Sequence, residues 1–224
     1  MPGSKWEYPE DPGNEISQLG KSMEDIADDW IRFFFFVDRK DHPYSQNDWS
    51  FDRRLALDER QKVFYKDQNE GLAKTWFLLP GKMPGFHRTN LPENRIWAVM
   101  FSPYMTCAST FEYPSKKTEG DLKKFVMSDT DKVYKVEALV NGETLTTARV
   151  TRSAEVNIVE NSVIDNTARA DKVQVFYDGL FVLLMPLPLG ETIVTSRGYS
   201  PVFENDIRYS IYTRKLPEDF TSKQ

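Results

Sequence analysis

The chain has 224 residues, of which 40% are hydrophobic and 13% aromatic, so it is long enough to bury a substantial core. Its formal net charge of −5 argues against nucleic acid or an anionic membrane surface as the main partner. A single cysteine, Cys107, excludes an intramolecular disulfide and a zinc site built on paired cysteines. The longest uncharged apolar run, residues 179–189, contains two prolines and is too short to span a membrane.

The first residues predict an arm followed by a helix. Residues 1–14 are rich in proline, glycine and charge, a composition typical of an extended or disordered segment. No basic segment followed by an apolar one opens the chain, so we expect a cytoplasmic protein, or a secreted one if a signal peptide was removed. Over residues 15–37 apolar side chains recur at spacings of three and four, which predicts an amphipathic helix packed on the core. Ser22 and Asp25 have the spacing of a capping box and indicate where its regular part begins.

A polar and irregular segment, residues 38–70, follows the helix. Connections of this length are uncommon unless they have a function, so we interpret it as a candidate lid. It contains clustered oxygen ligands of the kind that calcium prefers, at Asp38, Asp41, Asn47 and Asp48. A structural calcium ion is therefore the one cofactor that the sequence leaves open.

From residue 72 onward, short runs rich in β-branched and aromatic residues alternate with turn signals. This pattern predicts a mainly β fold, an antiparallel β-sandwich or jelly-roll-like domain over residues 15–216 with a tail at 217–224. Residues 118–132 interrupt the strands with a short inserted helix that Thr118 and Asp121 open. Asn141-Gly142, between two alternating runs, predicts a hairpin with a type I′ turn.

Residues 176–198 read FYDGLFVLLMPLPLGETIVTSRG, and we interpret them as a buried β-hairpin. LFVLLM does not alternate between apolar and polar residues, which predicts a strand covered on both faces. Pro186 and Pro188 have no N–H to donate, so they end its ladder. Gly190 then reverses the chain into the next strand.

This stretch carries a resemblance to a known family. YDGLFVLLMPLPLGETIVTSRG is similar to the DGYW…L.PL.PG.H.I.F.G motif of an uncharacterised, often secreted microbial protein family, and TWFLLPGK…LPENRIWAVMF resembles that family's WFLAG…VPAGKxLFFP motif. The resemblance covers most of the chain and implies a shared β fold without an established activity. The sequence departs from the motifs at three pairs of residues: Leu180-Phe181, Glu191-Thr192 and Asn94-Arg95.

An enzyme is one of the functions that the sequence allows. It contains no GxSxG elbow and neither of the glycine-rich phosphate-binding motifs, which excludes the common hydrolase and nucleotide signatures. What remains is a small-molecule enzyme with an acid–base pair, His87 with Glu112 or Asp178, in a β-sandwich pocket. This alternative requires these side chains to converge in one closed pocket.

Recognition of a ligand or partner is the function that we favour from the sequence. Large aromatic rings on an open sheet face can stack on a small molecule or a glycan. The candidate ligand-binding residues are Trp76, Arg88, Trp97, Tyr104 and Tyr177. A third interpretation is a structural protein whose acidic N-terminal helix docks onto a partner or onto a second copy of the chain.

Overall fold

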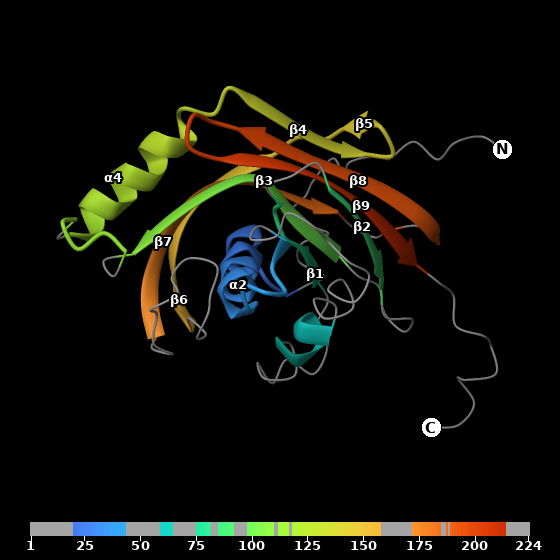
Figure 1. Cartoon of the computed structure of the whole chain (residues 1–224), viewed down its shortest axis with the longest axis horizontal. Coiled ribbons are helices and arrows are strands. Elements are labelled where there is room, and N and C mark those ends of the chain that lie inside the picture. Colours follow the sequence, from blue (N-terminus) through green and yellow to red (C-terminus); the bar gives the residue numbers. More distant parts are fainter. Residues whose placement is uncertain are drawn as a thin grey trace.

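Two β-sheets packed face to face make up most of the structure (Figure 1), a computed structural model. One sheet has the strand order β1 (Thr75–Leu78), β3 (Ala98–Ser109), β7 (Lys172–Leu184), β6 (Ala148–Asn157). The other has the order β2 (Gly85–Asn90), β9 (Glu204–Thr213), β8 (Gly190–Tyr199), β4 (Lys135–Val140), β5 (Glu143–Thr144). The predicted mainly β sandwich is therefore confirmed. The structure describes residues 20–43, 59–64, 75–81, 85–91, 98–109, 112–116, 118–157, 172–184, 187 and 189–213.

Most strands pair in the antiparallel sense that the sequence predicts. Five of the seven pairings among the described strands are antiparallel. The other two, β1 with β3 and β2 with β9, are parallel and lie at one edge of each sheet. Parallel partners need long connections, and here β2 of the other sheet comes between β1 and β3 in the chain, whereas strands of both sheets come between β2 and β9.

The N-terminal helix α2 spans Met23–Phe36. Ser22 Oγ accepts a hydrogen bond from the Asp25 N–H at 3.1 Å, and Asp25 Oδ2 accepts one from the Ser22 N–H at 3.3 Å, which confirms the capping box. The helix begins later than the predicted residue 15, because Gly20 has a left-handed φ of 70° and Ser22 is extended. Residues 1–19 lie outside the described part of the chain.

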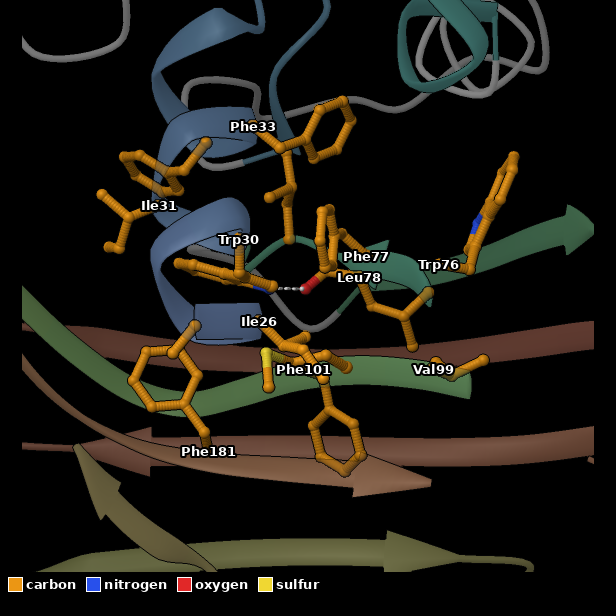
Figure 2. Close-up of a cluster of buried hydrophobic side chains, with 14 of the residues drawn as sticks. Ile26, Trp30, Ile31, Phe33, Trp76, Phe77, Leu78, Val99, Phe101 and Phe181 are labelled. Atoms are coloured by element: carbon orange, nitrogen blue, oxygen red, sulfur yellow. Dashed lines mark hydrogen bonds between the residues drawn. The ribbon is translucent and has the colours of Figure 1, made fainter. Parts of the chain in front are cut away.

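Helix α2 packs on one face of the four-stranded sheet and forms the centre of the core (Figure 2). Trp30 is fully buried and donates from Nε1 to the Leu78 carbonyl oxygen at 3.1 Å. Its ring meets Phe181 of β7 edge to face, with 5.6 Å between the ring centroids. Removing a buried ring of this size typically costs about 3–5 kcal/mol, so this contact is a major term in holding the helix on the sheet.

The predicted inserted helix is α4, Glu119–Thr130, and Thr118 Oγ1 caps it by accepting from the Asp121 N–H at 3.1 Å. Leu122 and Val126 pack against Ala108 of β3 and Phe176 of β7. Since successive residues of a strand point to opposite faces, α4 lies on the face of the four-stranded sheet opposite to α2, as Figure 1 shows.

The predicted hairpin joins β4 to β5. Asn141 has a φ of 51° and Gly142 a φ of 89°, the two positive values that a type I′ turn requires. Asn141 Oδ1 also accepts a hydrogen bond from the Ile193 N–H of β8 at 2.8 Å. This turn is therefore confirmed and is tied to the neighbouring strand.

The predicted hairpin between residues 176 and 198 is wrong, although its first strand is the expected central one. β7 lies between β3 and β6 in the four-stranded sheet, whereas β8 lies between β9 and β4 in the other sheet. Both edges of β7 are already occupied, so the returning strand has no place beside it. The proline-rich connection instead takes the chain from one sheet to the other, and Gly190 opens β8 with a φ of 105°.

The two sheets are in close contact where Gly198 of β8 and Asn205 of β9 meet Pro103 of β3. A Cβ atom built on Gly198 would lie 2.2 Å from the Pro103 carbonyl oxygen, so only glycine fits there. Asn205 of β9 is fully buried and donates from Nδ2 to the Pro103 oxygen at 3.0 Å and to Ser196 Oγ at 3.1 Å. Its Oδ1 accepts from the Gly81 N–H at 3.1 Å. One buried amide thus links three parts of the sandwich.

The hairpin turn can be tested by Gly142→Ala. No atom lies near the added methyl group, so the cost comes from the positive φ alone and should lower the free energy of unfolding by about 1–2 kcal/mol. Gly120→Ala in α4 is the matched control and should be neutral or stabilising. Urea denaturation measures both; equal stability of the two variants would contradict the turn.

The contact between the sheets can be tested by Gly198→Ala. The clashing atom is a backbone oxygen that cannot swing away, so we expect a loss of about 1–3 kcal/mol or more. In the control Gly81→Ala, the new methyl group meets the far end of the Ile207 side chain at 3.0 Å, which can adjust. Thermal unfolding should rank Gly198→Ala well below Gly81→Ala, and the reverse order would refute this packing.

Candidate functional site

The predicted acid–base residues lie on different elements of the two sheets. Asp178 lies in the middle of β7 in the four-stranded sheet, and Glu112 lies three residues after the end of β3. His87 lies on β2 of the other sheet, paired with Tyr209, and its side chain is outside the description. Glu112 accepts from Ser109 Oγ at 3.3 Å, whereas Asp178 has a separate set of partners. The enzymatic alternative gains no support from this placement.

Asp178 is a fully buried carboxylate whose partners hold helix α4. Arg149 Nε lies 3.1 Å from both of its oxygens, and Thr151 Oγ1 donates at 2.6 Å. The same guanidinium bonds Asp131 at 2.7 Å and the Met127 carbonyl oxygen at 3.4 Å, both at the end of α4. Asp178 raises the pKa of Arg149 above its usual range. Arg149 therefore supplies the cation at the C-terminal end of α4 that the helix itself lacks.

The next row across the same sheet consists of Cys107, Tyr177 and Arg152, which are paired on β3, β7 and β6. Tyr177 donates from its hydroxyl to Asp28 Oδ1 of α2 at 2.6 Å, and Arg152 lies 3.3 Å from Asp28 Oδ2. Burial raises the pKa of Asp28 and also raises that of the Cys107 thiol, so Cys107 stays protonated and unreactive at neutral pH. This row fastens α2 to the sheet.

Sequence reasoning missed Asp28. A signal was available, because Asp28 lies three and seven residues before Ile31 and Phe35, on a second apolar stripe of the helix. A carboxylate on an apolar stripe needs a buried partner, and here that partner is Tyr177.

The candidate ligand-binding rings belong to the core. Trp76, Tyr104 and Tyr177 have at most 2% of their surface exposed, so none of these rings is open to a ligand. The Tyr104 hydroxyl donates to Ser200 Oγ at 3.1 Å and lies between the sheets. Arg88 lies on β2, paired with Ser210, and the structure does not describe its side chain. Trp97 lies outside the described residues.

An open polar surface lies instead on the outer face of the five-stranded sheet. Glu137, Arg197 and Asp206 are directly paired across β4, β8 and β9. Arg197 donates from Nη1 to Glu137 Oε2 at 2.9 Å and from Nε to Asp206 Oδ1 at 2.8 Å. The hydrogen bond from Arg197 lowers the pKa of Glu137, so this carboxylate is ionised at neutral pH. Figure 1 shows no described helix or strand beyond this face of the sheet.

An exposed tyrosine borders this row. Tyr134 is 69% exposed, stacks on Tyr199 with 6.5 Å between the ring centroids, and donates from its backbone N–H to the Tyr199 carbonyl oxygen at 3.1 Å. Tyr199 donates to Asp206 Oδ2 at 2.8 Å, and its pKa is raised to about 12 by burial and by Asp206. Lys135 Nζ lies 5.4 Å from the centre of the Tyr199 ring. We call this surface the Tyr134 platform, which consists of Tyr134, Lys135, Glu137, Arg197, Tyr199 and Asp206.

The sequence contains the alternation that puts these side chains on one face of each strand, but not the order of the strands. Arg197 and Tyr199 are two residues apart on β8, Asp206 follows on β9, and Glu137 of β4 lies 60 residues before Arg197 in the chain. Their adjacency follows from the strand order β9-β8-β4, which no local pattern predicts.

Part of the predicted lid packs on the core. His42 has no exposed surface, and its ring meets Phe34 of α2 edge to face at 4.6 Å between centroids. Among the described residues, no three His, Cys, Asp or Glu side chains are close enough to hold a metal ion. The calcium prediction also involves Asn47 and Asp48, which lie outside the described residues, so it stays a prediction.

Comparisons with known proteins give no further guide. The chain matches no protein-family model, no curated protein and no solved structure. The resemblance to the uncharacterised microbial family therefore stays a prediction. Within the described part of the chain, no helix has the length and apolar character needed to cross a bilayer.

The buried titratable groups predict opposite responses to acid. Burial lowers the pKa of His42 from 6.5 to about 3, so the folded state binds fewer protons than the unfolded state between these values and loses stability as the pH falls. His42→Gln does not titrate and should reduce this loss by up to about 3 kcal/mol at pH 4. Urea denaturation between pH 4 and 7 measures the difference.

Asp28→Asn should change the pH dependence of stability in the direction opposite to His42→Gln. Because the pKa of Asp28 is raised, the folded state keeps a proton at higher pH than the unfolded state, and the wild type gains stability from this group as the pH falls through the raised pKa. The variant lacks that gain and should lose stability more steeply in acid. If both variants changed the slope in the same direction, the assigned environments would be wrong.

Proposed function

We propose that the protein is a recognition domain that binds a ligand or partner on the Tyr134 platform. The observation that carries this proposal is the large exposed ring of Tyr134, which stacks on Tyr199, while a backbone hydrogen bond to Tyr199 holds its main chain against β8. A tyrosine side chain has only two rotatable torsions, so it offers a large contact area to a partner with little loss of side-chain entropy.

The polar groups beside the ring support the same function. The side chains of Arg197, Glu137 and Asp206 are 38%, 31% and 20% exposed, so they are fixed by their ion pairs and still reachable from solvent. Groups that are already oriented form hydrogen bonds to a partner at a lower entropic cost than mobile surface side chains. An exposed aromatic ring flanked by oriented donors and acceptors is a common composition of binding surfaces.

The buried polar rows support the proposal by contrast. Asp178 is committed to Arg149 and Thr151, and Asp28 is committed to Tyr177 and Arg152. Each row fastens a helix to the four-stranded sheet, so the polar side chains of these rows already have partners within the fold. The Tyr134 platform is the described polar cluster that combines an exposed aromatic ring with reachable charged groups.

A binding screen with two variants tests this proposal. Amide chemical shifts of 15N-labelled protein are recorded with a panel of neutral oligosaccharides, acidic oligosaccharides, and acidic and basic peptides. We expect at least one ligand to shift amides of β4, β8 and β9, and Tyr134→Ala to abolish this shift. Leu189→Ala removes a similarly exposed side chain, 64% against 69%, at the other end of β8 and should leave it unchanged. Binding only at other strands, or none, would refute the platform.

A further inference from the structure

We infer that the ligand of the Tyr134 platform is a neutral oligosaccharide. This inference rests on the proposed function and adds the chemical class of the ligand. Its basis is the combination of an open aromatic ring with a set of charges that cancel.

The charge balance of the platform disfavours a charged ligand. Lys135 and Arg197 contribute two positive charges, and Glu137 and Asp206 contribute two negative ones, all joined in ion pairs of 2.8–3.1 Å. An anion at the platform would be attracted by two of these groups and repelled by the other two, and the same holds for a cation. A neutral ligand avoids this repulsion and also avoids desolvating a net charge.

The hydrogen-bonding capacity of the platform suits hydroxyl groups. Each of the four carboxylate oxygens of Glu137 and Asp206 has one donor among the described residues, from Lys135, Arg197 or Tyr199. A carboxylate oxygen has about two acceptor positions, so each can accept one more hydrogen bond. Arg197 Nη2 makes no hydrogen bond to the described residues and can donate. A hydroxyl group both donates and accepts, so it can use both kinds of position.

The Tyr134 ring provides the apolar contact that a sugar also needs. One face of a pyranose ring carries mainly C–H groups and packs flat on an aromatic ring, whereas its edge carries the hydroxyls. Tyr134 comes directly before β4, and its ring contacts Tyr199, whose hydroxyl donates to Asp206, so a sugar stacked on it lies beside the charged row. The net charge of the chain, −5, also argues against a polyanion such as nucleic acid on this face.

Matched oligosaccharides test the inference. Isothermal titration and amide shifts are measured with hexamers of β-1,4-linked glucose, xylose and mannose, and with a hexamer of galacturonic acid as the charged counterpart. We expect a neutral hexamer to bind and to shift amides of β4, β8 and β9. Tyr134→Ala should weaken its binding roughly tenfold or more, whereas Tyr134→Phe should stay within about twofold because the ring face is kept. Leu189→Ala is the control for a lost exposed side chain, and unchanged thermal unfolding of each variant verifies the fold.

The outcomes separate this inference from the proposed function. If the galacturonic acid hexamer bound the platform as tightly as the neutral hexamers or more tightly, the inference of a neutral ligand would be wrong. The proposed function, recognition at the platform, would still hold. If a peptide but no oligosaccharide shifted amides of β4, β8 and β9, the ligand class would again be wrong and the proposed function would again hold. If neutral hexamers bound with unchanged affinity to Tyr134→Ala, the site would lie elsewhere and both proposals would fall.

Discussion

The structure depends on two neighbouring residues of β7 that fasten a helix to each face of one sheet. Tyr177 bonds Asp28 of α2, and Asp178 bonds Arg149, whose guanidinium reaches the end of α4. Because consecutive strand residues point in opposite directions, a single position along β7 anchors both helices. Apolar packing supplies most of the free energy, through Trp30 and its neighbours, while the two polar links set where each helix lies.

The elements that the sequence predicts well are those whose signals are local. Ser22 and Asp25, Thr118 and Asp121, and Asn141-Gly142 each act over two to four residues, and their caps and turn are found where expected. What could not be predicted depends on contacts between distant segments. The strand after Pro186 and Pro188 joins the other sheet because β3 and β6 occupy both edges of β7, and nothing within residues 176–198 encodes that.

The candidate site also depends partly on local sequence signals and partly on contacts between distant segments. Sequence patterns identify aromatic residues, but burial separates Trp76, Tyr104 and Tyr177 from Tyr134, and burial is a property of the assembled sheets. The Tyr134 platform combines residues of three strands that are adjacent only through the order β9-β8-β4. The ion pairs that orient the charged groups of the platform also cancel their charges, so preorganisation and neutrality have one origin.

The arginines of β6 have a consequence for the behaviour of the protein at high concentration. Among the described strands, β6 ends the four-stranded sheet, and a terminal strand of ten residues offers its backbone to strands of other molecules. Arg149 and Arg152 lean to opposite sides of this strand, toward Asp178 and Asp28. An incoming strand would have to displace or bury these charges, which discourages β-sheet aggregation along this border. The arginine side chains that anchor the helices thus also disfavour pairing of this edge strand with a second molecule.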